Sequence, residues 1–130
     1  MATINKFEEL EVWKLARVIC QKVFGYINKD GFYKDFSLKD QILRSSGSIM
    51  DNISEGFERG SRKEFIHYLS ISKASSGECR SQLYRAIDRE YITNEEFEEL
   101  HNMLILESQK LSSFMKYLNK SDYKGTKYKY

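Results

Sequence analysis

SLKDQILRSSGSIMDNISEGFERGSRKEF, residues 37–65, carries the clearest helical pattern in the sequence. Residues at three- and four-residue spacing fall on one face of a helix there; they are Ile42, Ser46, Ile49, Ile53 and Phe57. Glycines between positions 56 and 60 suit the C-terminal cap of that helix. Ser61 with Glu64 forms a capping box that opens another helix. The stretch therefore predicts two amphipathic helices joined by a short turn.

The same spacing recurs outside this stretch and predicts four helices in all. They cover about residues 7–28, 37–57, 61–90 and 93–118. In each of the last three, a Ser or Thr is followed three residues later by an acid, which predicts an N-cap. These pairs are Ser37 with Asp40, Ser61 with Glu64, and Thr93 with Glu96. The absence of proline favours long, uninterrupted helices.

Short connections make consecutive helices antiparallel. We therefore expect an all-α fold, an antiparallel up-down-up-down four-helix bundle over residues 1–118, with a Lys/Tyr-rich C-terminal tail at 119–130. The first connection has Asp30-Gly31 turn chemistry. Its aromatic residues Phe32, Tyr33 and Phe36 are expected to tuck against one end of the bundle.

Composition excludes several classes of protein. No stretch approaches the ~20 apolar residues of a membrane-spanning helix, and no apolar secretory signal precedes Glu8. We expect a cytoplasmic protein in which Cys20 and Cys79 are reduced packing thiols. The net charge of +2 does not by itself indicate nucleic-acid binding. The charge is unevenly distributed, with an acidic cluster between Glu95 and Glu99 and a lysine-rich C-terminus.

The stretch 41–56, QILRSSGSIMDNISEG, resembles the signature Q-x-x-R-A-x-x-S-I-x-x-N-I-A-E-G of a known family. FERGSRKEF at 57–65 and FEELEVWKLA at 7–16 also fit. The chain is thereby similar to bacterial four-helix bundle proteins encoded in intervening sequences of 23S ribosomal RNA genes, also called S23 ribosomal proteins. It also resembles the accessory variability proteins of diversity-generating retroelements. The motif positions are Gln41, Ser48, Asn52, Glu55, Gly56 and Glu78.

The resemblance implies assembly into a homopentamer. It also implies, for the retroelement branch, binding to nucleic acid and to a reverse transcriptase. A ribosomal role does not follow from the family label. Where the family tends to read A-x-G-S-x-x-E-L, this chain has SKASSGEC at 72–79, which puts the subunit interface in doubt. We expect Ser48, Asn52 and Glu78 to be half-buried polar residues that fix helix register by hydrogen bonds.

No catalytic arrangement of residues is recognisable in the sequence. We therefore expect that the protein is not an enzyme and binds no cofactor. The serines lie in no Gly-x-Ser-x-Gly elbow, and there is no phosphate-binding loop or dinucleotide fingerprint. Two Glu-x-x-His pairs, Glu64 with His67 and Glu98 with His101, invite comparison with di-iron bundles. In antiparallel helices these pairs would lie ~20 Å apart, too far to share metal ions. We therefore expect no metal site.

Basic residues form two groups that could contact phosphates. The first group is Arg44, Arg59, Arg62, Lys63, Arg80, Arg85 and Arg89. The second is Lys120, Lys124, Lys127 and Lys129, interleaved with tyrosines that could stack on unpaired bases. The alternative interpretation is a solvated helix face and a tail that only adds solubility.

Two further features have open interpretations. The small-residue runs Ser45–Ser48 and Ala74–Gly77 indicate close approach of helices, either within the bundle or from a neighbouring subunit. Glu107 occupies an apolar position of its helix, where an unpaired carboxylate would be costly. We expect it to pair with Arg80 or Lys73, or to lie in an interface.

These observations favour a non-enzymatic homo-oligomer, a pentamer, that binds RNA or DNA without sequence preference through basic surface residues. The alternative is a protein-interaction adaptor with no nucleic-acid role, whose partner would be a reverse transcriptase or a ribosome-associated protein. No membrane partner is expected.

Overall fold

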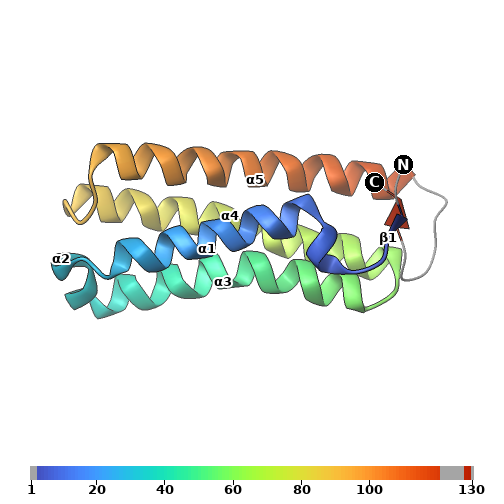
Figure 1. The fold of residues 1–130 in the computed structure, drawn as a ribbon, viewed down its shortest axis with the longest axis horizontal. Helices are drawn as coiled ribbons and strands as arrows, with labels where there is room; N and C mark the ends of the chain where they lie inside the picture. The colour runs from blue at the N-terminus through green and yellow to red at the C-terminus, as the bar shows by residue number, and fades with distance from the viewer. Residues whose placement is uncertain (1–2, 121–127, 130) are drawn as a thin grey trace.

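The computed structural model describes residues 3–120 and the pair 128–129, and Figure 1 shows their arrangement. Four long helices dominate: α1 (Glu11–Ile27), α3 (Phe36–Glu58), α4 (Arg62–Asp88) and α5 (Asn94–Lys120). A short helix, α2 (Asp30–Lys34), connects α1 to α3, and a 3-10 turn, η1 (Phe7–Glu9), precedes α1. The strands β1 (Thr3–Ile4) and β2 (Tyr128–Lys129) have two residues each. The expected all-helical fold class is confirmed.

The four long helices lie side by side, and consecutive ones run in opposite directions in Figure 1. Each packs against two others, since α1 contacts α3 and α5 while α4 contacts the same two helices. One hydrophobic core runs between them. It includes Phe65 and Phe114, whose rings meet edge to face at 5.4 Å between α4 and α5. Phe24 of α1 lies outside this core and is 60% exposed.

The first helix begins later than predicted. Instead of one helix from residue 7, the chain has the η1 turn and then extended backbone at Leu10, with φ −74° and ψ 129°. The Glu9 carboxylate accepts hydrogen bonds from the backbone N–H groups of Asn5 and Lys6, at 2.9 and 3.1 Å. The break turns Leu10 into the core, where it is 2% exposed. Helical periodicity alone could not separate this turn from the helix that follows.

In the first connection, the prediction of a turn whose aromatic residues tuck against one end of the bundle holds only in part. Residues 30–34 form α2, and only Phe32 is buried, with its ring stacked on Tyr91 at 5.3 Å. Tyr33 and Phe36 are 51% and 69% exposed. They lie instead around the ammonium group of Lys39, 3.6 Å from the Tyr33 ring centre and 4.9 Å from that of Phe36.

The predicted Ser37 cap of the second long helix is wrong. The N-cap of α3 is Asp35, whose carboxylate accepts from Leu38 N at 3.2 Å, so Ser37 lies inside the first turn. Tyr91 Oη and Arg89 Nη1 also donate to Asp35, at 2.8 and 2.6 Å. The bond from Tyr91, followed by those from Leu38 and Arg89, lowers the pKa of Asp35. A carboxylate with three donors is a stronger cap than a serine hydroxyl.

Asp35→Ala is therefore expected to lower the free energy of unfolding by about 1–2 kcal/mol. Ser37→Ala is the matched control, and its effect should stay within about 0.5 kcal/mol. Urea unfolding of both variants at neutral pH measures the difference. Equal losses in the two variants would contradict the assignment of Asp35 as the cap.

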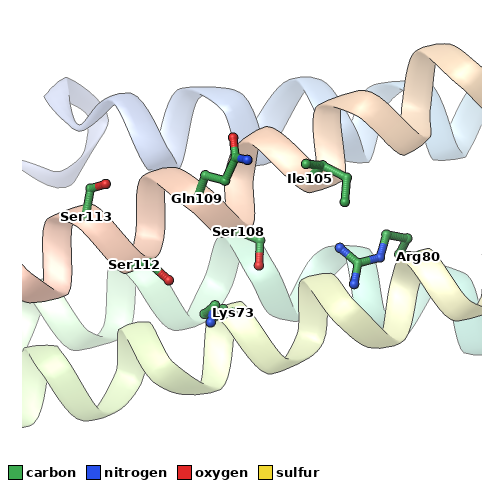
Figure 2. A pocket seen from close by; sticks show the side chains of 7 residues that line it. All are labelled: Lys73, Arg80, Ile105, Ser108, Gln109, Ser112 and Ser113. Carbon is green, nitrogen blue, oxygen red and sulfur yellow. The ribbon is translucent and has the colours of Figure 1, made fainter.

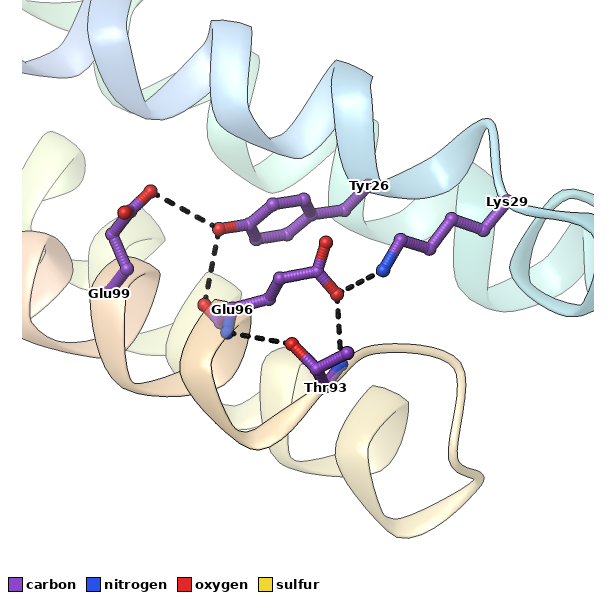
Figure 3. A network of polar contacts seen from close by, with 5 residues as sticks. All are labelled: Tyr26, Lys29, Thr93, Glu96 and Glu99. Carbon is purple, nitrogen blue, oxygen red and sulfur yellow. Dashed lines mark hydrogen bonds and ion pairs between the residues drawn. The ribbon is translucent and has the colours of Figure 1, made fainter.

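The other two caps form as predicted at their serine and threonine. Ser61 Oγ accepts from Glu64 N at 3.4 Å. Thr93 and Glu96 form the complete reciprocal box, with bonds of 3.1 and 2.8 Å. In Figure 3 this box is joined to α1 and to the connection after it, because Tyr26 Oη donates to the Glu96 carbonyl at 3.2 Å and Lys29 pairs with the Glu96 carboxylate. Burial, with Glu99 and Glu96 nearby, raises the pKa of Tyr26 to about 12. Part of the acidic cluster is thus structural.

The C-terminal region also departs from the prediction. The last helix extends to Lys120, two residues into the expected tail. Thr3 pairs with Lys129 and Ile4 with Tyr128 in an antiparallel register, so these two residues of the expected tail lie beside the N-terminal strand. Residues 121–127 and 130 lie outside the described part of the chain. Among the described residues, no helix combines the length and apolar character needed to cross a membrane.

Candidate nucleic-acid interface

Four of the seven candidate arginines and lysines on α3 and α4, or just beyond their ends, are engaged within the chain. Arg44, Arg59 and Arg89 form ion pairs with Asp40, Glu55 and Asp35, at 2.8, 2.8 and 2.6 Å. Arg85 donates to the Gln41 side chain at 2.6 Å. Arg59 also donates to Tyr68 Oη at 2.7 Å, and Glu55 is the main cause of its raised pKa. The structure does not bring these residues together as one basic site.

Arg62, Lys63 and Arg80 have no ion-pair partner among the described residues. All three lie on α4. Of the second group, Lys120 is exposed at the end of α5, and Lys129 is described only as a backbone partner of Thr3. Lys124 and Lys127 lie outside the described residues.

Arg80 lies in a groove between α4 and α5 that Figure 2 shows from close by. The groove has a volume of ≈ 420 Å³ and is continuous with a neighbouring hollow of ≈ 520 Å³, since Lys73, Arg80 and Ser108 line both. In Figure 2 the hydroxyls of Ser108 and Ser112 point from α5 toward α4. We call this feature the α4–α5 groove. The remaining lining residues are Ile105, Gln109, Ser113, Ser70, Ala74, Gly77 and Met115.

The α4–α5 groove is positively charged. Its lining contains two cations, Lys73 and Arg80, and no aspartate or glutamate. Lys73, like Arg80, has no ion-pair partner among the residues described. Sequence reasoning placed Lys73 opposite Glu107 and left it out of the phosphate-binding candidates. The signal that could have found it is the i, i+7 spacing to Arg80, which puts both cations on one helix face.

Gly56, the motif glycine, differs in its surroundings from the glycines of the small-residue runs. A Cβ at Gly56 would lie 2.6 Å from Tyr68 Cβ and 3.1 Å from Phe65 Cδ1, so this glycine lets α3 and α4 approach closely. The glycines inside the two runs, Gly47 and Gly77, differ, because an added Cβ would meet no atom within 4 Å. Close approach within the chain therefore does not explain these two glycines.

Serines of the two runs join α3 to α4 by hydrogen bonds. Ser48 Oγ lies 2.8 Å from Ser75 Oγ, and Asn52 Nδ2 donates to Ser48 Oγ at 2.8 Å. Both Ser48 and Asn52 are half-buried, as predicted. Glu78 was wrongly predicted to belong to this set, since it is exposed and accepts no side-chain hydrogen bond from the described residues.

Sequence reasoning also missed a second polar contact between α3 and α4. The buried Ser45 hydroxyl donates to Gln82 Oε1 at 2.6 Å. Gln82 lies on the face of α4 turned toward α3, and its contact with Ser45 was not predicted.

Glu107 was expected to be paired, and that expectation is wrong within the chain. Its side chain is 0% exposed, and neither carboxylate oxygen has a hydrogen-bond partner in the described structure. Lys73 and Arg80 line the α4–α5 groove instead of reaching it. Burial raises the pKa of Glu107 to about 8, and Lys110 offsets this only in part. The carboxyl group is therefore mainly protonated at pH 7.

The thiols and histidines form no recognisable reactive site. Cys20 and Cys79 are both free, and burial raises their pKa to about 11 and about 12. Thiols with raised pKa are poor nucleophiles. His67 is exposed, and His101 packs against Tyr84 and Phe97. No group of three or more potential metal ligands occurs in the described ranges 3–120 and 128–129.

Comparison with known proteins shows which family this chain resembles. The family model described as 23S rRNA-intervening sequence protein matches residues 8–113. A crystal structure of a protein with unknown function from the S23 ribosomal protein family of Bacteroides thetaiotaomicron VPI-5482 superposes with a TM-score of 0.75. The two chains are 31% identical, and the match covers 81% of this chain and 98% of that one. No curated protein matches the chain.

Proposed function

The chain belongs to the family of 23S rRNA-intervening sequence proteins, and we propose that it is a non-enzymatic, homo-oligomeric four-helix bundle that binds RNA or DNA. The bundle has up-down-up-down topology, the oligomer is a pentamer, and the protein works in the cytoplasm. Binding is independent of base sequence, because basic surface residues contact phosphates, which carry no sequence information.

The observation that carries the proposal is the set of unpaired cations along α4. Arg62, Lys63, Lys73 and Arg80 have no ion-pair partner among the described residues, whereas Arg44, Arg59 and Arg89 are paired. An unpaired surface cation contacts phosphate without first breaking an ion pair inside the protein. The paired arginines contribute through the general field around the molecule.

Exposed apolar side chains support the oligomer. Phe24 and Phe36 are 60% and 69% exposed, and Val18 and Leu106 are 39% and 44% exposed. Contact between subunits would remove such surface from water, at roughly 25 cal/mol per Å². An oligomer would also repeat the unpaired cations around one particle. Several weak contacts to one strand then raise the avidity without any new interaction.

The expected result for binding is a steep loss of affinity with salt. Titration of a fluorescent mixed-sequence RNA with the full chain should show log K falling linearly with log salt concentration, because bound cations release counterions. A second oligonucleotide of unrelated sequence should bind equally well. Affinity that ignores salt, or no binding at low salt, would contradict the proposal.

A protein-interaction adaptor is the second candidate, and the exposed Phe24 and Phe36 favour it because they suit an apolar partner. The partner would be a reverse transcriptase or a ribosome-associated protein. Capture of partners from the native host, with and without nuclease, separates the two candidates. Proteins retained after nuclease treatment support the adaptor, whereas proteins lost with the nucleic acid support the first proposal.

A further inference from the structure

We propose that the α4–α5 groove binds a single-stranded segment of RNA or DNA, with phosphates at Lys73 and Arg80 and one base against Tyr84. The inference rests on the proposed nucleic-acid function. It adds the place of contact and the form of the strand.

Residues on one face of α4 are spaced to contact a single nucleic-acid strand. Lys73, Gly77, Arg80 and Tyr84 follow one another at four-, three- and four-residue spacing, so they share the face of α4 that borders α5. Lys73 and Arg80 are seven residues apart, which is ~10.5 Å along the helix. That distance exceeds the size of one phosphate group. The pair therefore suits two phosphates of one chain better than a free phosphate ion.

The lining of the α4–α5 groove carries donors that suit phosphate groups. Arg80 can donate two parallel hydrogen bonds to one phosphate, and Lys73 supplies a compact charge to another. The hydroxyls of Ser108 and Ser112 point across the groove and add neutral donors. A helix from a second subunit would fit poorly here, because Ile105 and Met115 are the only large apolar residues in the lining.

Gly77 is a glycine in the middle of α4. A glycine inside a helix costs about 1 kcal/mol relative to alanine. At Gly77 an added Cβ would meet no atom of the chain within 4 Å, so internal packing does not require the glycine. Gly77 lies between Lys73 and Arg80 on the same face, where a bare backbone leaves room for a ligand to come close to the helix.

Tyr84 favours a single strand over a duplex. It lies one turn beyond Arg80 and is 48% exposed. Its ring is held edge-on by Phe97 at 5.0 Å and by His101 at 5.6 Å. A fixed, half-exposed ring can stack on an unpaired base. The bases of a duplex are already stacked on one another and do not offer that face.

The test is fluorescence anisotropy with the full chain at low salt, using a short single-stranded RNA of mixed sequence and the matching duplex. The double variant Lys73→Ala/Arg80→Ala should weaken single-strand binding about tenfold and reduce the salt slope by about 1.4. The matched control is Arg17→Ala/Lys34→Ala, which removes the same charge at exposed positions outside the groove and should change both values much less. Inorganic phosphate should compete far more weakly than the oligonucleotide.

Single variants test the other two parts of the proposal. Gly77→Ala should weaken binding, whereas Gly47→Ala, which also adds a methyl group in open space, should not. Tyr84→Ala should weaken single-strand binding at least about fivefold and leave duplex binding unchanged, while Tyr84→Phe keeps the stacking ring and the affinity.

The possible failures can be told apart. If the wild-type protein binds RNA but the groove double variant behaves like its control, the groove assignment is wrong and the proposed function stands. If the wild-type protein binds no nucleic acid at low salt, both are wrong. If the groove variants lower the particle mass in light scattering, the groove is a subunit contact, and the assignment is also overturned.

Discussion

Replacing Glu107 by leucine is expected to raise the free energy of unfolding at pH 7 by about 3 kcal/mol or more. The carboxyl group is fully buried without a hydrogen-bond partner, and its pKa rises from an ordinary 4.5 to about 8. In the unfolded chain the group ionises near pH 4.5 and is hydrated. Folding at pH 7 must therefore take up a proton and bury a polar group, and both steps oppose folding.

The raised pKa of Glu107 also determines how the free energy of unfolding changes with pH. Because the pKa of Glu107 is higher in the folded state, the unfolded state loses its proton first, and stability falls as pH rises from about 4.5 to about 8. Glu107→Gln and Glu107→Leu should remove this loss. Their advantage over wild type should grow by about 1.4 kcal/mol per pH unit in that window and level off above pH 8.

Urea unfolding at several pH values and one fixed protein concentration measures the effect. Glu98→Gln is the matched control, because Glu98 is an exposed glutamate of the same helix, and it should follow the wild-type profile. A profile for Glu107→Gln that parallels wild type across the window would show that Glu107 is ionised or partnered in the folded protein.

The second large effect concerns Gly56. Gly56→Ala is expected to lower the free energy of unfolding by about 1–3 kcal/mol, because overpacking forces backbone and side chains apart. The added Cβ would lie 2.6 Å from Tyr68 Cβ, an atom close to the backbone of α4 that cannot move alone. Alanine is a better helix former than glycine, so the loss occurs despite a favourable change in propensity.

Gly47→Ala is the control on the same helix. Its Cβ would meet nothing within 4 Å, so this variant should gain up to about 1 kcal/mol from helix propensity. Chemical unfolding of both variants gives two changes of opposite sign. A stabilised Gly56→Ala would show that α3 and α4 do not approach closely at this point.

The sequence predicted the long helices because each carries several apolar residues at helical spacing, and these outweigh single exceptions. The sequence predicted less accurately where the helices begin and end. The α3 cap is Asp35 and not Ser37, because contacts with Arg89 and Tyr91, more than fifty residues away, hold the carboxylate in place. The break at Leu10 and the pairing of β1 with β2 likewise depend on contacts that local spacing does not contain.

The candidate site was harder to predict, because a basic residue matters only if it is free of partners. Arg44 and Arg80 look alike in the sequence, yet Arg44 is paired with Asp40 and Arg80 lines the α4–α5 groove. Lys73 was predicted to pair with Glu107. Helix periodicity shows on which face of a helix a residue lies, but it does not show which neighbouring helix that face contacts. The sequence did not predict that Ser108 and Ser112 line the groove, because this depends on how α5 packs against α4.

Light scattering of the full chain, with and without single-stranded RNA, at low and at high salt, tests the assembly and the nucleic-acid function together. The predicted result is a particle near five times the 15.4 kDa of one chain, which gains mass with RNA at low salt and returns to its original mass at high salt. A particle with the mass of one chain that does not change with RNA at either salt concentration would contradict both the assembly and the nucleic-acid function.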